Sequence, residues 1–132
     1  MVKGKLILAD SASNHTDGTV SMLRGFITHV HGKEPPYELQ GVLVTHIRAE
    51  VGDEGPHKFE VRCMDTDGGR ALPPLQATIN VPAGGGSSVV VLGLAVQFQE
   101  IGDYVFVLRV DNVELDTMLL TVDNNVPTEK NE

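Results

Sequence analysis

The stretch KFEVRCM at residues 58–64 decides the fold class of this chain. In it, the apolar residues Phe59, Val61 and Cys63 alternate with three charged residues. Successive side chains of a β-strand point to opposite faces of the sheet, so this alternation buries one set and leaves the other in water. The stretch therefore predicts a strand in a sheet with one buried face.

Seven further segments share this character, because they are short, rich in Val, Ile, Leu and Thr, and bounded by Gly, Pro, Asp or Asn. Turn sequences such as Asp17-Gly18 and Asp111-Asn112 accept positive φ or bond to their own backbone, and they predict hairpins. No window of eleven residues has helical apolar spacing free of Pro and Gly, so we expect at most one helical turn, at residues 99–102. The expected strands are residues 5–9, 19–30, 40–49, 58–64, 75–81, 88–98, 104–110 and 114–122.

Eight such strands predict an all-β fold, an antiparallel sandwich. The length of 132 residues is typical of one domain, which we place at residues 1–123. The polar residues 124–132 are expected to form a flexible C-terminal tail.

The charge and apolar content exclude several kinds of partner. The formal net charge of -8 disfavours nucleic acid and anionic membrane surfaces, and the Lys and Arg residues are scattered singly along the sequence. The longest apolar run, residues 89–96, is far shorter than the roughly 20 residues of a spanning helix. Cys63 is the only cysteine, so no intramolecular disulfide can form, and the N-terminus has no signal-peptide core. We expect a cytoplasmic protein.

The stretch GDYVFVL at residues 102–108 resembles the penultimate strand of immunoglobulin-like domains, in which a tyrosine opens the strand two residues before a core position. Here the tyrosine is Tyr104 and the core position is Phe106. The resemblance implies that the Tyr104 hydroxyl bonds back to the backbone of the preceding crossover. The chain has no tryptophan and no cysteine pair, so an antibody-type domain is excluded.

Most of the chain is also similar to a family of small bacterial β-sandwich proteins of unknown function. That resemblance implies the fold and assigns no activity, so it transfers no site residues. It rests on LAD at residues 8–10, Asp17-Gly18, LRGF at residues 23–26 and GDY at residues 102–104.

His29 and His31 form the strongest candidate for a metal or small-ligand site. They are two residues apart, which on a strand places both on one face, where two-point coordination is possible. A closed zinc site uses four ligands, so other strands would have to supply the rest. The candidates for a third ligand are His15, Glu34, His46 and His57.

Four other patterns are better explained by structure than by chemistry. The segment DTDGG at residues 65–69 resembles half a calcium loop but lacks the distal glutamate, so we expect a hairpin turn. The segment GGGSS at residues 84–88 precedes a strand rather than a helix, so we expect a linker instead of a phosphate site. Cys63 lies on the same face of its expected strand as Phe59 and Val61, so its thiol is expected to be buried and inert. The carboxylate pairs Asp53-Glu54 and Glu114 with Asp116 are expected to be solvated.

No serine lies in a nucleophile elbow, and the sequence assigns no catalytic, cofactor-binding or metal-ligating residue. The leading hypothesis is therefore a non-enzymatic protein-interaction or structural module that binds an unknown protein. Self-association through an exposed sheet edge is a further possibility. The alternative is a small-ligand or metal-binding protein that uses the face of His29 and His31.

Overall fold

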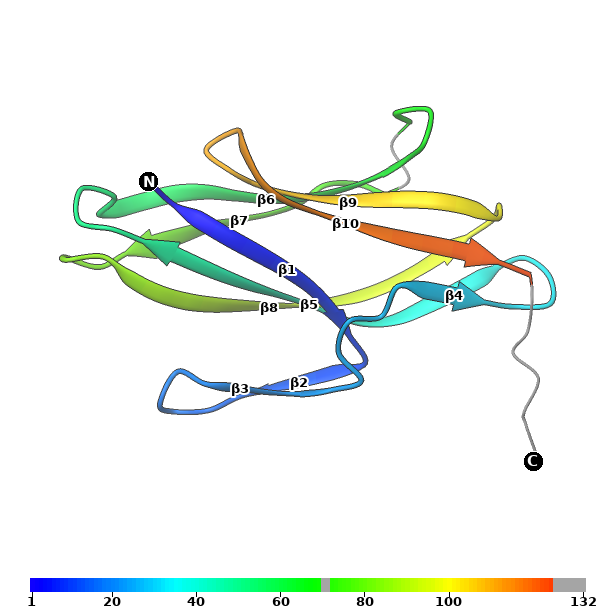
Figure 1. The fold of residues 1–132 in the computed structure, drawn as a ribbon, viewed down its shortest axis with the longest axis horizontal. Helices are drawn as coiled ribbons and strands as arrows, with labels where there is room; N and C mark the ends of the chain where they lie inside the picture. Colours follow the sequence, from blue (N-terminus) through cyan, green and yellow to red (C-terminus); the bar gives the residue numbers. More distant parts are fainter. Residues whose placement is uncertain (70–71, 125–132) are drawn as a thin grey trace.

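The computed structural model describes residues 1–69 and 72–124, and every regular element of this part is a β-strand. Figure 1 shows two layers of strands with a separate hairpin beneath them. The strands are β1 (Lys3–Ala9), β2 (Ser11–Asn14), β3 (Val20–Leu23), β4 (His29–His31), β5 (Tyr37–Ala49), β6 (Gly55–Asp65), β7 (Leu75–Val81), β8 (Gly86–Phe98), β9 (Gly102–Val110) and β10 (Val113–Asp123).

The strand order is that of an immunoglobulin-like sandwich. One sheet has the order β1-β5-β8, and the other has the order β4-β10-β9-β6-β7. In the immunoglobulin scheme β1, β5 and β8 take the places of strands A, B and E, and β6, β9 and β10 take those of C, F and G. All ladders are antiparallel except the one between β4 and the end of β10, which is parallel. The predicted fold class is confirmed.

The core lies between the two sheets, and the alternation that predicted it holds in β6. Phe59, Val61 and Cys63 are each at most 2% exposed. The opposite face of β6 departs from expectation, because Glu60 is only 3% exposed instead of solvated. Its carboxylate accepts bonds from Arg62 Nε at 2.7 Å and Gln76 Nε2 at 2.9 Å. The bond from Gln76, and then the bond from Arg62, lower the pKa of Glu60, so the buried carboxylate keeps its negative charge.

Tyr104 makes the hydrogen bond that the resemblance implied. Its hydroxyl donates to the Glu100 carbonyl at 2.9 Å, and its ring packs on Phe98 with centroids 4.5 Å apart. Residues 99–101 bend without forming the helical turn considered above, and Gly102 already belongs to β9. The Tyr104 side chain thus connects β9 to the crossover between the sheets.

The single strand expected at residues 19–30 was wrong. Arg24 and Phe26 have φ of 51° and 62°, a left-handed conformation that an extended strand cannot contain. The segment is therefore split into β3 and β4. The short strand β2 was missed, and it pairs with β3 in a hairpin that projects from the sandwich (Figure 1). The other seven expected strands are confirmed, with ends that differ by at most three residues.

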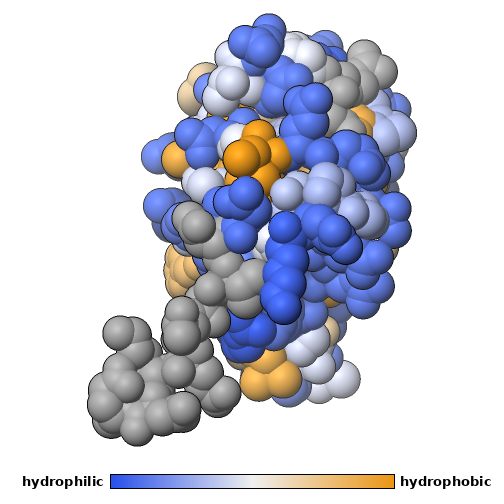
Figure 2. Space-filling model, turned by 90° about the vertical axis from the view of Figure 1, so that its right-hand side faces the viewer, coloured by the Kyte–Doolittle hydropathy of each residue, from blue (hydrophilic) through white to orange (hydrophobic). Residues whose placement is uncertain are grey.

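The last strand ends at Asp123, and nearly all of the tail expected at residues 124–132 lies outside the described residues. No helix within the described residues is long and apolar enough to cross a membrane. The end of the sandwich on the right of Figure 1 is largely hydrophilic, with a few isolated apolar spots (Figure 2).

Candidate binding groove

The sandwich is open on the side where β1 and β10 form the margins of the two sheets. β1 pairs only with β5, and the free margin of β10 pairs with β4 only at residues 121–123. A bulge between Glu114 and Asp116 shifts the register of β10 here. The Asp116 carboxylate accepts a bond from the Leu6 N–H at 2.8 Å, so one side chain bridges the two sheets.

The outward edge of β1 is closed at two residues and open at two others. The Leu6 N–H is bound by Asp116, and the Leu8 carbonyl accepts a bond from the Ile27 N–H at 2.9 Å. Backbone groups of a strand alternate in direction, so Gly4 also presents its N–H and C=O away from β5, and the same alternation extended to the residue before β1 gives Val2 this orientation. Within residues 1–69 and 72–124 no hydrogen bond reaches these outward groups. The start of β1 is therefore a free strand edge.

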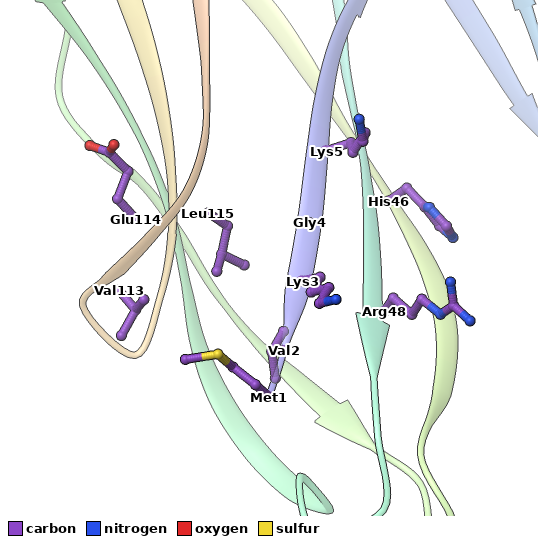
Figure 3. Close-up of a pocket in the computed structure, with 10 residues that line it drawn as sticks. All are labelled: Met1, Val2, Lys3, Gly4, Lys5, His46, Arg48, Val113, Glu114 and Leu115. Atoms are coloured by element: carbon purple, nitrogen blue, oxygen red, sulfur yellow. The ribbon is translucent and has the colours of Figure 1, made fainter.

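A groove of about 610 Å³ lies along this free edge, and we call it the edge groove (Figure 3). Its apolar wall consists of Val2, Val113 and Leu115. At Gly4 a Cβ would lie 2.9 Å from Leu108 Cδ2 and 3.2 Å from Leu115 Cδ1, so both leucine side chains would have to shift to accommodate it. The glycine lets Leu115 pack close to β1. The complete lining is Met1, Val2, Lys3, Gly4, Lys5, His46, Arg48, Val113, Glu114 and Leu115.

The other side of the edge groove is a basic rim of Lys3, Lys5, His46 and Arg48 (Figure 3). Lys3 lies opposite Arg48 and Lys5 opposite His46, so all four side chains share the outer face of the sheet. Like charges directly opposite each other destabilise a sheet. None of the four makes an ion pair with any residue that the structure describes. The rim is thus an uncompensated positive cluster.

The basic rim corrects the interpretation that positive residues are scattered singly. They are scattered along the sequence, but three of the ten Lys and Arg residues meet in space. Two period-2 pairs, Lys3 with Lys5 and His46 with Arg48, carried the signal. Their meeting depends on the register between β1 and β5, which the sequence alone does not reveal.

Beside the edge groove, His57 fastens the turn between β9 and β10. Its Nδ1 lies 2.5 Å from Asp111 Oδ2, and its Nε2 contacts the Asp53 carbonyl. The bond to the Asp53 carbonyl, and then that to Asp111, raise the pKa of His57. The bond from His57 lowers the pKa of Asp111, which also accepts the Lys58 N–H. The arrangement favours an imidazolium–carboxylate pair that joins β6 to the turn between β9 and β10.

His29 and His31 lie on one face of β4 as predicted, with rings stacked 5.7 Å apart. His29 Nδ1 lies 3.0 Å from Thr28 Oγ1, and His31 Nδ1 lies 2.6 Å from Asp123 Oδ1. The described residues contain no group of three side chains suited to hold a metal.

The other residues considered as a third ligand belong to other parts of the fold. His15 Nε2 lies 2.7 Å from Ser21 Oγ on the projecting hairpin. His46 lies in the basic rim, and His57 is held by Asp111. Glu34 lies in the connection between β4 and β5, outside any described metal-ligating group. Among residues 1–69 and 72–124, the structure does not bring His29 and His31 together with a third ligand.

The remaining candidates are explained by turns and by burial. Asp65 Oδ1 accepts the N–H groups of Asp67 and Gly69, so its carboxylate closes the hairpin turn after β6. Residues 84 and 85 lie in the connection between β7 and β8, whereas residues 86–88 pair with β5 as the start of β8, so the expected linker was wrong for those three residues. No helix follows the segment. Burial raises the pKa of the Cys63 thiol to about 12, which keeps it protonated. Two carboxylates that were expected to be solvated are exceptions. Asp116 bonds to β1, and Asp53, whose side chain is 18% exposed, accepts the Glu50 N–H at 2.9 Å and pairs with the Met1 amino group at 3.1 Å.

Strand order, the Tyr104 corner and the absence of an internal disulfide define an immunoglobulin-like β-sandwich of the disulfide-free kind. The chain belongs to a family of unknown function, DUF6941, whose model matches residues 5–123. No curated protein matches the chain.

Among solved structures the chain is similar to an immunoglobulin-like protein, PA1606, from Pseudomonas aeruginosa. The sequence identity is 13% and the TM-score is 0.43, over 93% of this chain and 97% of that one.

Proposed function

We propose that this protein is a non-enzymatic interaction domain that holds a segment of a partner protein in the edge groove. The observation that carries the proposal is the free backbone edge at Val2 and Gly4, flanked by the apolar wall and the basic rim. Unpaired strand edges bind other chains readily, and proteins normally cover or blunt them. Here the edge is covered at Leu6 and left free beside a groove.

The chemistry of the groove supports binding over catalysis. Its ionisable side chains are the four basic groups of the rim and Glu114, and no nucleophile bonded to a base is among its lining residues. The only thiol, that of Cys63, is buried in the core. A single reduced cysteine also suits a cytoplasmic location, which we include in the proposal.

A metal or small-ligand function at His29 and His31 ranks second. Their stacked rings and the neighbouring Asp123 favour it. It lacks a third ligand among the described residues, whereas the edge groove has both shape and charge.

Affinity capture from the native cell lysate with two matched baits tests the proposal. Val113 in the apolar wall is 49% exposed and Leu119, on the same strand outside the groove, is 55% exposed. Val113→Glu and Leu119→Glu therefore introduce the same charge at similar exposure. We expect proteins retained by the wild type and by Leu119→Glu to be depleted about tenfold or more by Val113→Glu, because the new carboxylate disrupts a desolvated contact.

A further variant, Leu23→Glu, tests whether the projecting hairpin binds the partner instead of the groove, because Leu23 on that hairpin is 68% exposed. If Leu23→Glu depletes the captured proteins and Val113→Glu does not, the hairpin is the binding element and the proposal is wrong. Capture that is equal for all baits would also contradict it.

A further inference from the structure

We infer that the edge groove binds an extended acidic segment of the partner, which adds to β1 as a short strand with alternating acidic and apolar residues. This inference rests on the proposed function and specifies the chemistry of the partner. Three properties of the groove lead to it: the free backbone edge, the two unlike walls, and the sign of the charge.

The backbone edge selects an extended peptide. Val2 and Gly4 offer N–H and C=O groups in the direction where the next strand of the sheet would lie. An added strand would run about 4.8 Å from β1 and bond to these groups, as in known cases of peptide addition to a sheet edge. The bond between Leu6 and Asp116 limits the addition to the first residues of β1.

The two walls select an alternating pattern of side chains. Successive side chains of the added strand point to opposite faces of the sheet. Those on the outer face would lie beside Lys3 and Lys5, and those on the inner face would contact Val113 and Leu115. A peptide that alternates carboxylates with apolar residues satisfies both walls at once.

The charge selects acidic over basic segments and argues against a second copy of the chain. The basic rim lies on a molecule of net charge -8, and Glu114 is the single carboxylate among the lining residues of the groove, so the rim attracts an acidic segment to this edge. If two copies paired through β1, the Lys3 and Lys5 side chains of both would lie on adjoining strands. Such like charges repel, so self-association through this edge is disfavoured.

The probes are two terminally blocked heptapeptides that alternate valine with either glutamate or lysine, each with a fluorescent label for anisotropy titration. We expect the glutamate peptide to bind roughly tenfold or more tightly than the lysine peptide, and to weaken as salt is added. Equal affinity for the two peptides would overturn the inference.

Two pairs of variants separate charge from backbone. Lys3→Glu should weaken the glutamate peptide about tenfold, whereas Lys33→Glu, the same charge change on the connection between β4 and β5, should change affinity far less. Val2→Pro removes an outward N–H that makes no bond in the sandwich, so the fold should tolerate it. We expect Val2→Pro to abolish binding and Val2→Ala to retain most of it.

Several outcomes would overturn the inference while the folded state, checked by thermal melting, is intact. Binding that survives Val2→Pro and is displaced by inorganic phosphate would show a site for small anions. A dimer seen by sedimentation that Val2→Pro converts to monomer would place a second copy at the edge. If the glutamate peptide fails at millimolar concentration while capture still depends on Val113, only the acidic strand is refuted. If that capture fails too, the proposed function falls with it.

Discussion

The Tyr104 hydroxyl stabilises the crossover between β8 and β9. It donates to the Glu100 carbonyl at 2.9 Å and is partly buried, so its loss leaves an acceptor without its partner. We predict that Tyr104→Phe lowers the free energy of unfolding by about 1–2 kcal/mol. Chemical denaturation of the variant beside the wild type measures the difference. An unchanged midpoint would show that the bond does not stabilise the crossover.

His57 makes stability depend on pH in a way that can be predicted from the sign of two shifts. Its pKa is raised above 6.5 in the folded state, so its contribution is complete below pH 6.5 and is lost as the pH rises through the folded value. The pKa of Asp111 is lowered below 3.8, so its contribution is complete above that pH and is lost in acid. Both contributions are therefore complete between pH 3.8 and pH 6.5.

We predict that wild-type stability falls as the pH is raised from 6 to 9 by about 0.2–1 kcal/mol, the range for pairs that water partly screens. His57→Gln should reduce this fall, because glutamine does not titrate, and the remainder belongs to the Met1 amino group, whose pKa is raised by its bonds to Asp53 and Glu50. Denaturation midpoints at several pH values measure both slopes. Parallel slopes for wild type and variant would mean that His57 does not contribute to the pH dependence.

Strand β1 has one edge that no neighbouring strand covers, and Asp116 closes part of this edge. The carboxylate accepts the Leu6 N–H across the opening between the sheets. We predict that Asp116→Ala costs roughly 1 kcal/mol and that Asp116→Asn, which keeps an acceptor oxygen, costs less. Urea denaturation of the two variants provides the test. Equal costs would indicate that the strand edge does not need this acceptor.

The sequence predicted most strands because their apolar period is local, and it missed the hairpin for a physical reason. Residues 19–30 have enough apolar residues for one strand, but Arg24 and Phe26 have left-handed φ values. The amino-acid composition of the segment does not predict these values. The edge groove was missed for another reason. Its walls come from β1, β5 and β10, and only the strand register brings them together.

For the molecule as a whole, the fold class was predictable because it follows from patterns within single segments. The Tyr104 bond was implied by the resemblance of residues 102–108 to the penultimate strand of immunoglobulin-like domains. The basic rim could not be predicted from net charge, because a total of -8 conceals a local positive cluster. Lys3 and Lys5 are distant in sequence from His46 and Arg48. The two pairs come together only in the folded sheet.

We also predict that neither zinc nor calcium raises the melting temperature. A ligand at a hundredfold excess over its Kd stabilises the folded state by about 2.7 kcal/mol, which shifts the melting temperature by several degrees. His29 and His31 lack a third described ligand, and Asp65 is bound by its own turn. Calorimetry with each metal at micromolar concentration checks this. A zinc shift that disappears in the His29→Ala/His31→Ala double variant would raise the metal hypothesis to first place.

Both the proposed function and the acidic partner depend on the free edge at the start of β1, which amide hydrogen exchange can detect directly. We predict slow exchange at Lys3 and Lys5, which bond to β5, and at Leu6, which bonds to Asp116, but fast exchange at Gly4. Fast exchange at all four would mean that the strand end is frayed. Slow exchange at Gly4 in the free protein would mean that its N–H is already bonded, and would contradict the claim that this edge is free to receive a partner.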